Sequence, residues 1–346
     1  MDTRRAKALE KPDARMALSW MAAQPYPSPP LNAPELMDLR RISARDLHPV
    51  LEEEVAAWKQ ELSWDFEASA ELVRRFVDLH ALTGCALVSG GKVIGYAYYV
   101  LEDSKALVGG LYVRRQARSP ALDRQLLDLV LREAMVNPSV RRIESQLMMA
   151  PLVPDHMLPF SQFATIFERN FMRLDLRSAK LDPRPLRRSV HFEKWSDAYQ
   201  EAAARLVAKA YEGHIDSRIN DQYCSVAGAR RLLSNIVQFP GCGTFFRPAS
   251  YLAFEEPSGR LCGISLASLV ARDSGHITQI CVSPAELHRT GIGRELMRQS
   301  LTALLEFGCQ DATLAVTAAN ADAMVLYEHL GFSVARRFSA YVWAGF

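Results

Sequence analysis

The order of predicted elements repeats once along the chain, and this repeat constrains the fold more than any other feature. Each half predicts helix, helix, hairpin, strand, helix and strand. The segment "ALVSGGKVIGYAYYV" in the first half takes the place of "LAFEEPSGRLCGISLA" in the second, and each contains a glycine turn typical of a hairpin. Because solenoid repeats are only about 20–50 residues long, this longer period indicates a duplicated domain.

The predicted elements define an α/β (α+β) fold class with helices beside a sheet in each half. The first half has helices over 44–62, 70–82 and 119–135, a hairpin over 84–102, and strands over 105–115 and 140–149. The second half has helices over 196–214, 227–239, 291–308 and 321–332, a hairpin over 249–271, and strands over 275–284, 311–320 and 336–343. Glycines at 308 and 331 are suited to end the last two helices.

Proline-rich stretches predict where the domains begin and end. The stretch "QPYPSPPLNAPE" cannot sustain a helix, so residues 1–36 are predicted to be a poorly ordered leader. The stretch "LDPRPLRRS" predicts a linker over 181–189. The two domains are then expected over 37–180 and 190–346.

Charge and cysteine content exclude several classes of protein. The 346 residues include 41 basic and 39 acidic ones spread along the chain, which does not give the basic surface of a nucleic-acid-binding protein. No apolar stretch reaches the roughly 18 residues that a membrane span needs. The six cysteines form no CxxC pair and no zinc pattern, which is typical of free thiols in a reducing cytosol. We therefore expect a cytoplasmic protein without nucleic-acid, membrane or metal partners.

The segment "HRTGIGRELM" is a candidate phosphate site because a strand precedes it and a helix follows it. Glycines let backbone N–H groups turn inward, and a helix N-terminus offers free donors and a positive dipole end. The donors would come from Gly291, Ile292, Gly293 and Arg294, with added charge from Arg289. A tight turn without a ligand is the alternative that this segment alone leaves open.

Two other phosphate-binding motifs do not fit this segment. A Walker loop requires Lys followed by Ser or Thr, which this segment lacks. A dinucleotide fingerprint requires a third glycine and a place at the start of its domain, whereas Leu296 stands near the third position and the segment comes late.

Together with its neighbours, the segment resembles the acyl-CoA motif of the GNAT (Gcn5-related N-acetyltransferase) superfamily. The strand end "ICVSP" is followed by His288, Arg289, Thr290, Gly291, Ile292 and Gly293. The family usually has Arg or Gln where His288 stands, and Arg289 lies one position further on. A second family motif follows as Asn320 and "LYEHLGF". The resemblance covers about residues 190–346 and implies two GNAT-like domains, each with a mixed, mostly antiparallel central sheet flanked by helices.

The resemblance also implies roles for individual residues. The backbone of Ile280, Cys281 and Val282 would pair with the pantetheine arm of acetyl-CoA, the expected co-substrate. Tyr327 would protonate the departing thiolate, although a tyrosine packed on an amphipathic helix is the alternative. Asn320 would contact the pantetheine amide or cap the last helix, and the two roles are compatible.

The acceptor site and general base are predicted from a polar stretch between two helices, "YEGHIDSRINDQYCS". Its candidate substrate contacts are His214, Asp216, Asn220, Asp221 and Tyr223, with Gln279 on the neighbouring strand. The predicted strand over 275–284 has no carboxylate, so we expect His214 or Asp216 to take the proton of the amine. Helix capping and an exposed loop are the alternative for this stretch.

The first half lacks the residues that mark the second as an acyl-CoA site. Pro120 and Ala121 stand where the glycine loop should be, and Asn170 replaces the glycine before Phe171. We therefore expect the first half to be a degenerate copy that binds CoA poorly. Its paired glycines, 109 and 110, are predicted to form a β-bulge.

The resulting expectation is an acetyl-CoA-dependent N-acetyltransferase whose second half catalyses direct attack of a primary amine on the thioester. The acceptor is a small-molecule amine or a protein N-terminus, and the protein is a monomer or a homodimer. Three alternatives stay open: another acyl-CoA donor, an alcohol acceptor, and a non-catalytic CoA sensor or scaffold.

Overall fold

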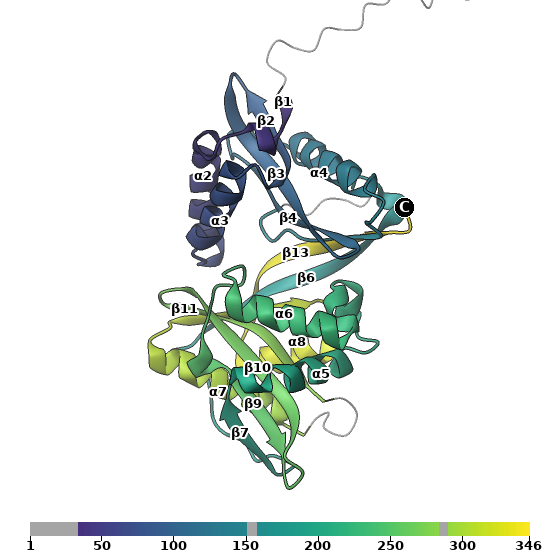
Figure 1. Ribbon diagram of the computed structural model, residues 1–346. Helices are drawn as coiled ribbons and strands as arrows, with labels where there is room; N and C mark the ends of the chain where they lie inside the picture. The colour runs from purple at the N-terminus through teal and green to yellow at the C-terminus, as the bar shows by residue number, and fades with distance from the viewer. Residues whose placement is uncertain (1–33, 151–157, 284–289) are drawn as a thin grey trace, which may run out of the picture.

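The computed structural model describes residues 34–150, 158–283 and 290–346, which form two lobes joined by a shared sheet (Figure 1). Most of the predicted leader lies outside the described residues. Its last two residues, 35 and 36, are an exception, because they belong to strand β1 (Glu35–Asp38), which pairs with the following hairpin. The fold class is confirmed as a mixed, mostly antiparallel sheet flanked by helices.

The N-terminal lobe, or N-lobe, contains the elements of the first half. They are α2 (Ala44–Leu62), α3 (Glu67–Asp78), β2 (Thr83–Ser89), β3 (Lys92–Glu102), β4 (Lys105–Val113), α4 (Pro120–Met135) and β5 (Arg142–Gln146), followed by β6 (Ala164–Asp175). A capping box of Ser43 and Asp46 starts α2 where the hydrophobic periodicity predicts. Ser119 caps α4, as its sequence predicts.

The C-terminal lobe, or C-lobe, contains the elements of the second half. They are β7 (Val190–Lys194), α5 (Gln200–Ala210), α6 (Val226–Gln238), β8 (Thr244–Phe245), β9 (Tyr251–Glu255), β10 (Arg260–Ala271), β11 (Ser274–Val282), α7 (Ile292–Phe307), β12 (Asp311–Thr317), α8 (Ala321–Leu330) and β13 (Ser333–Ala344). Two 3-10 turns, η5 (Ile215–Arg218) and η6 (Asp221–Cys224), precede α6. Gly308 and Gly331 end α7 and α8 in left-handed conformations, which confirms their predicted role.

The two lobes exchange strands. The sheet runs β1-β2-β3-β4-β5-β13-β6-β12-β11-β10-β9-β7, with β8 paired to β10. Strand β6, from the first half of the chain, pairs with β12 in the C-lobe, and β13, the last strand, pairs with β5 in the N-lobe. The lobes therefore interlock in space, although the predicted linker separates them cleanly in sequence.

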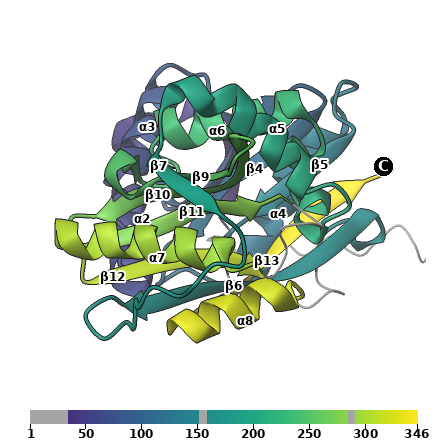
Figure 2. The ribbon, with the colours of Figure 1, turned by 90° about the horizontal axis from the view of Figure 1, so that it is seen from below.

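Helices cover both faces of the sheet in each lobe. In the N-lobe, α2 and α3 lie on one face and α4 on the other (Figure 1). In the C-lobe, α5 and α6 lie on one face, whereas α7 and α8 lie on the opposite face (Figure 2). Burial of these apolar faces is the main stabilising contribution in both lobes.

The exchange predicts that a core residue near the C-terminus stabilises the N-lobe. Trp343 on β13 is fully buried in the core formed by α4 and β2–β5. Replacing Trp343 with Ala should cost about 3–5 kcal/mol because it leaves a large cavity. Hydrogen exchange should speed up first at the amides of β4 and β5.

The matched control is Trp195→Ala, which removes an equally buried indole from the core under α5 and α6. Its exchange should speed up first in the C-lobe. If hydrogen exchange in Trp343→Ala were faster only in the C-lobe, the result would contradict the placement of β13 in the N-lobe.

Candidate active site

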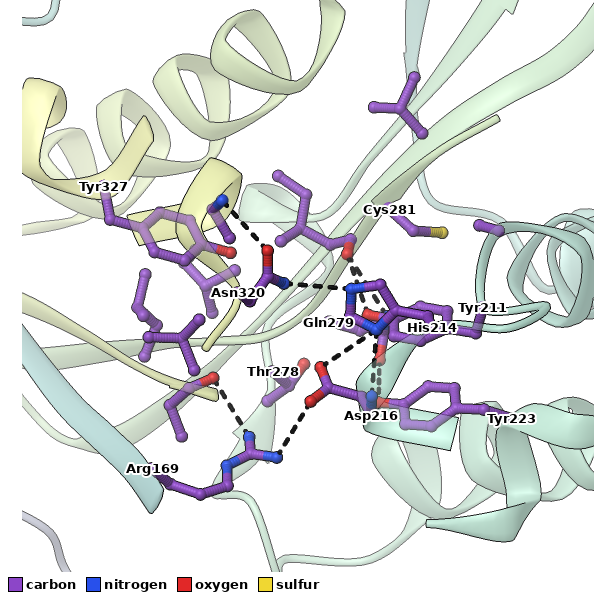
Figure 3. Close-up of a pocket in the computed structure, with 18 residues that line it drawn as sticks. Arg169, Tyr211, His214, Asp216, Tyr223, Thr278, Gln279, Cys281, Asn320 and Tyr327 are labelled. Carbon is purple, nitrogen blue, oxygen red and sulfur yellow. Dashed lines mark hydrogen bonds and ion pairs between the residues drawn. The ribbon is translucent and has the colours of Figure 1, made fainter. Parts of the chain in front are cut away.

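A cleft opens in the C-lobe where two parallel strands separate. Strands β11 and β12 pair only from Ser274 to Ile277 on the β11 side, and the register with β10 shifts at the next residue, Thr278. Beyond that point, β11 and β12 diverge around a cavity of about 230 Å³ (Figure 3). Among the described residues, the β12-facing edge of 278–282 therefore has no strand partner.

Most of the sequence-predicted catalytic and substrate residues line this cleft. The lining residues are Arg169, Ala210, Tyr211, His214, Asp216, Tyr223, Ile277, Thr278, Gln279, Ile280, Cys281, Val282, Leu314, Ala315, Val316, Asn320, Ala323 and Tyr327. Sequence reasoning missed Arg169 and did not select Tyr211, although the latter begins the polar stretch. Local sequence gives no signal for Arg169, because it reaches the cleft only through the exchanged strand β6.

Tyr327 projects from α8 into the cleft and is 7% exposed. Burial raises the pKa of its phenol well above the usual value, and the negative charge of Asp216 adds to this rise, whereas Arg169 opposes it. The hydroxyl therefore keeps its proton at neutral pH. A buried, protonated phenol can donate a proton or a hydrogen bond to a group in the cleft.

Asn320 and His214 join the start of α8 to the polar stretch. The Oδ1 atom of Asn320 accepts a hydrogen bond from the backbone N–H of Ala323 at 3.2 Å, which confirms the capping role. Its Nδ2 atom lies 3.2 Å from Nε2 of His214. The other ring nitrogen of His214 accepts from the backbone N–H of Asp216 at 3.1 Å and caps η5. The imidazole is therefore fixed in orientation at the cleft wall.

Asp216 is the carboxylate of the cleft. Its Oδ1 atom accepts a hydrogen bond from the hydroxyl of Thr317 and lies 3.7 Å from Nη1 of Arg169. Its Oδ2 atom lies 3.8 Å from Nδ1 of His214. The cleft thus places one acidic group between a guanidinium and an imidazole (Figure 3).

Gln279 is held between two tyrosines. Tyr223 donates to its Oε1 atom at 2.9 Å, and its Nε2 atom donates to the hydroxyl of Tyr211 at 2.8 Å. The two phenol rings stack with centroids 4.0 Å apart. Burial raises the pKa of both phenols far above the usual value. These contacts commit the amide of Gln279 to fixing the tyrosines, which line the cleft as neutral hydrogen-bonding groups.

Two sequence-predicted substrate residues, Asn220 and Asp221, do not line the cleft. Asp221 pairs with Lys105 of the N-lobe. The side chain of Asn220 accepts from the backbone N–H of Gln222 at 3.0 Å and caps η6, so the capping alternative holds for this residue. His276, on the same strand as Gln279, also lies outside the cleft. Its ring packs 5.0 Å from that of Trp64 of the N-lobe, and burial lowers its pKa to about 3.

The glycine loop leads into α7 at the end of β11. His288 and Arg289 lie outside the described residues. Gly291 is the N-cap of α7 with φ of +93°, and it has no side chain that could accept a hydrogen bond from the N–H groups of the first turn. A Cβ atom at Gly293 would lie 3.5 Å from Val282, an ordinary van der Waals contact, so the packing there does not require glycine. The side chain of Ile292 is buried in the core, so only its backbone can face a ligand.

The linker lies beside the start of α7. A cavity of about 190 Å³ is lined by Arg184, Pro185, Leu186, Arg187, Thr290, Gly291, Arg294 and Glu295. The backbone N–H of Arg187 donates to the carbonyl of Thr290 at 3.2 Å, and Arg294 donates to the carbonyl of Asp182 at 3.1 Å. Burial lowers the pKa of Arg294, and the charge of Arg184 lowers it further. Guanidinium groups are thus crowded next to uncapped backbone donors.

The N-lobe retains the strand separation and lacks the uncapped loop. Strands β4 and β5 pair only from Lys105 to Val108 on the β4 side, and Gly109 is the extra residue of a bulge, as predicted. The helix that follows begins with Ser119 bonded to the backbone N–H of Leu122 and with Pro120, which has no N–H group. Its first turn therefore offers fewer free donors than that of α7.

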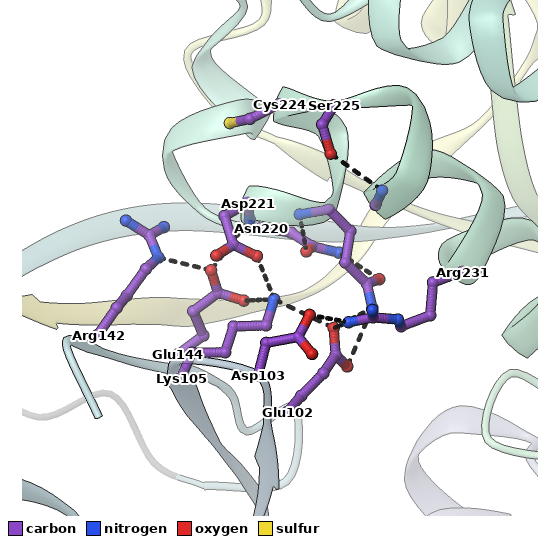
Figure 4. A network of polar contacts seen from close by, with 12 residues as sticks. Glu102, Asp103, Lys105, Arg142, Glu144, Asn220, Asp221, Cys224, Ser225 and Arg231 are labelled. Carbon is purple, nitrogen blue, oxygen red and sulfur yellow. Dashed lines mark hydrogen bonds and ion pairs between the residues drawn. The ribbon is translucent and has the colours of Figure 1, made fainter. Parts of the chain in front are cut away.

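A buried ion network ties the N-lobe to the loop that carries Tyr223 (Figure 4). Lys105 is 3% exposed, and its Nζ atom donates to Glu144 at 3.1 Å and to Asp221 of η6. Burial opposes the charge of Lys105, but the two carboxylates together raise its pKa above the usual value. The backbone N–H of Asp221 also donates to Glu144 at 3.0 Å. The N-lobe thus holds one wall of the cleft in place.

Metal ligation and membrane spanning find no support in residues 34–150, 158–283 and 290–346. No group of three or more His, Cys, Asp or Glu side chains there could hold a metal ion. None of the helices in these ranges is long and apolar enough to cross a membrane. Cys281, the thiol of the cleft, is buried, and its pKa rises to about 12 for that reason.

Comparison with known proteins identifies the fold and one domain. Residues 225–332 match the acetyltransferase (GNAT) family. A GCN5-related N-acetyltransferase from Sphaerobacter thermophilus is similar over 89% of this chain and 95% of its own, with a TM-score of 0.64 and 17% identity. A tandem GNAT protein from the clavulanic acid biosynthesis pathway is similar over 90% and 98%, with a TM-score of 0.57 and 16% identity. No curated protein sequence matches the chain.

The network predicts that Lys105 is essential to stability. Replacing Lys105 with Met should lower the free energy of unfolding by about 3 kcal/mol, because Glu144 and Asp221 lose their shared cation. Urea unfolding measures this loss. The control Lys92→Met changes an exposed residue at the start of β3 and should leave the midpoint unchanged. Equal midpoints for the two variants would contradict the assigned role.

Proposed function

We propose that the chain transfers the acetyl group of acetyl-CoA to a primary amine in the C-lobe cleft. The GNAT fold, the GNAT-family domain and the acyltransferase activity that they support are the basis of this proposal. The observation that carries this proposal is the placement of Tyr327. Its protonated phenol lines a cleft between separated strands, and the uncapped start of α7 lies at the end of one of them.

The co-substrate would be held by backbone groups of the C-lobe. The first-turn N–H groups of α7, from Gly291 to Arg294, would bind the pyrophosphate, with His288, Arg289 and Thr290 beside them. The free edge of Ile280, Cys281 and Val282 would pair with the pantetheine arm. Asn320 would contact the same arm from the start of α8.

The chain's own groups would then manage two protons and one developing charge. The amine nitrogen attacks the thioester carbon, and the C–S bond breaks as Tyr327 donates its proton to the thiolate sulfur. A backbone N–H of β11 near Cys281 or Val282 would stabilise the carbonyl oxygen as it becomes negative. We assign proton removal from the amine to His214 or Asp216, whose Nδ1 and Oδ2 atoms lie 3.8 Å apart at the cleft wall.

The N-lobe is proposed to act without CoA. The first turn of α4 is capped by Ser119 and begins with Pro120, so it lacks the free donors of α7. A Cβ atom at Gly109 would lie 2.3 Å from the Tyr98 ring, so this ring is packed directly against the bulge where β4 and β5 separate. The contribution of the N-lobe would be structural, through β6 and through the Lys105 network.

The role of Tyr327 predicts a selective loss of turnover. Tyr327→Phe should lower kcat about 100-fold to 1,000-fold, because the thiolate leaves unprotonated, and should leave acetyl-CoA binding nearly unchanged. The raised pKa also means that wild-type activity should persist as the pH rises past the usual tyrosine value. CoA release with a panel of amines measures turnover, and calorimetry measures binding.

The matched control is Tyr251→Phe on β9, outside the cleft, which should keep wild-type turnover. If the wild type binds CoA but turns over no combination of acyl-CoA with an amine or alcohol, the result would favour a CoA sensor. Absence of CoA binding would contradict both functions.

The linker arginines predict a charge effect on co-substrate binding. Arg184→Glu should raise KM for acetyl-CoA about tenfold without changing kcat, because it reverses a charge beside the proposed phosphate site. The effect should shrink at high salt. The control Lys180→Glu changes an exposed residue outside that cavity and should leave KM unchanged. An equal change in both variants would contradict a local phosphate contact.

A further inference from the structure

Arg169 carries more hydrogen-bonding capacity than its surroundings use. It lies on β6, opposite Thr317 of β12, and its side chain is 12% exposed. Its Nη2 atom donates to the carbonyl of Ala315 at 3.4 Å, at the long end of a hydrogen bond. Its Nε atom is buried and has no hydrogen-bond partner. A guanidinium has five N–H donors, and apart from the buried Nε the Nη1 and Nη2 groups keep N–H donors that make no hydrogen bond to the described residues.

The carboxylate nearest to Arg169 does not satisfy it. Oδ1 of Asp216 lies 3.7 Å from Nη1, beyond hydrogen-bond distance, and the same oxygen accepts from Thr317. A buried charge with unused donors is costly unless a partner arrives. The unused donors of Arg169 line the same cleft as Tyr327, so the partner would be bound next to the reacting groups.

The charges in the cleft have a definite arrangement. Among the described residues that line it, Arg169 is the one permanent cation and Asp216 the one carboxylate, with His214 beside the latter. Figure 3 shows Arg169 and Asp216 joined as an ion pair, with Thr278 beside them. A ligand with one positive and one negative group could therefore address both side chains.

Resting on the proposed function, we propose that the acceptor is a small amine that also carries a carboxylate, and that Arg169 binds this carboxylate. The planar fork of a guanidinium matches the two oxygens of a carboxylate. The acceptor ammonium would approach Asp216 and His214, where it would lose its proton. The cavity of about 230 Å³ must also admit the end of the thioester, which favours an acceptor of amino-acid size.

The proposal gives the strand exchange a functional consequence. Arg169 belongs to the first half of the chain, and it enters the C-lobe only because β6 pairs with β12 and β13. The acceptor specificity of the C-lobe would then depend on a residue from the other half. Arg169 would be a specificity-determining residue, whereas Tyr327 would carry the chemistry.

The test compares acceptors that differ only in the carboxylate. Amino acids with the amine at increasing distance from the carboxylate are paired with their carboxamides, and CoA release from acetyl-CoA is followed for each pair. The wild type should prefer the carboxylate member of at least one pair by about tenfold to a hundredfold in kcat/KM. Arg169→Gln should abolish this preference, because it should lower kcat/KM for the carboxylate member far more than for its carboxamide.

Arg169→Lys should retain part of the preference, since the charge remains without the fork. The matched control is Arg173→Gln on the same strand, whose guanidinium donates to Ser63 at 2.9 Å and does not line the cleft. It should keep the wild-type preference. Circular dichroism and thermal unfolding of each variant establish whether it folds. If Arg169→Gln does not fold, the wild-type comparison of carboxylates with carboxamides still tests the proposal.

Two outcomes overturn the proposal without touching the proposed function. Equal wild-type rates for carboxylates and carboxamides would exclude a carboxylate subsite. Equal losses for both members in Arg169→Gln would show that Arg169 acts on the thioester instead. If no pair is acetylated, the thermal stability of the acetyl-CoA-saturated protein is measured with the carboxylate and with the carboxamide of each pair. Stabilisation by the carboxylate alone that is lost in Arg169→Gln would support the carboxylate subsite. No such stabilisation would overturn it.

Discussion

The pairing of β6 with β13 at the centre of the sheet is the interaction on which the rest of the structure depends. Each of these 12-residue strands comes from one half of the chain and completes the other lobe. Trp343 on β13 fills the N-lobe core, and Phe171 and Met172 on β6 are fully buried. Since the core packed against α4 and the core packed against α7 and α8 both contain residues from the two halves, we expect the lobes to depend on each other for folding.

The two halves share one order of elements but differ at the helix that follows the separated strands, and the strand exchange links them. Both lobes keep the strand separation, at Val108 in one and at Ile277 in the other. The C-lobe combines it with an uncapped helix start at Gly291, whereas the N-lobe has Ser119 and Pro120 at that place. The N-lobe instead contacts the acceptor side of the other cleft through Arg169 and the Lys105 network.

Sequence predicted the features that depend on local patterns. Hydrophobic periodicity located α2 and α7, and glycines located the ends of α7 and α8. The short edge strands β1, β7 and β8 were missed, because a few residues carry too little alternation to be recognised. Motif spacing also selected Tyr327, Asn320 and the end of β11, which line one cleft.

The remaining features depend on contacts between distant parts of the chain. Asn220 looked like a substrate residue but caps η6, and a polar stretch alone does not distinguish capping from binding. Gln279 is engaged by two tyrosines from the segment before α6, which no spacing reveals. Arg169 is the strongest case, since its place in the cleft follows from a strand exchange between halves.

The central claim is that the C-lobe cleft alone holds the co-substrate, and hydrogen exchange in the presence of CoA tests it most directly. The account predicts slower exchange on adding CoA at Ile280–Val282 and in the first turn of α7, from Gly291 onwards. Exchange at 109–113 and in the first turn of α4 should be unchanged. Slower exchange in the N-lobe segments, or no change in the C-lobe segments, would contradict the account.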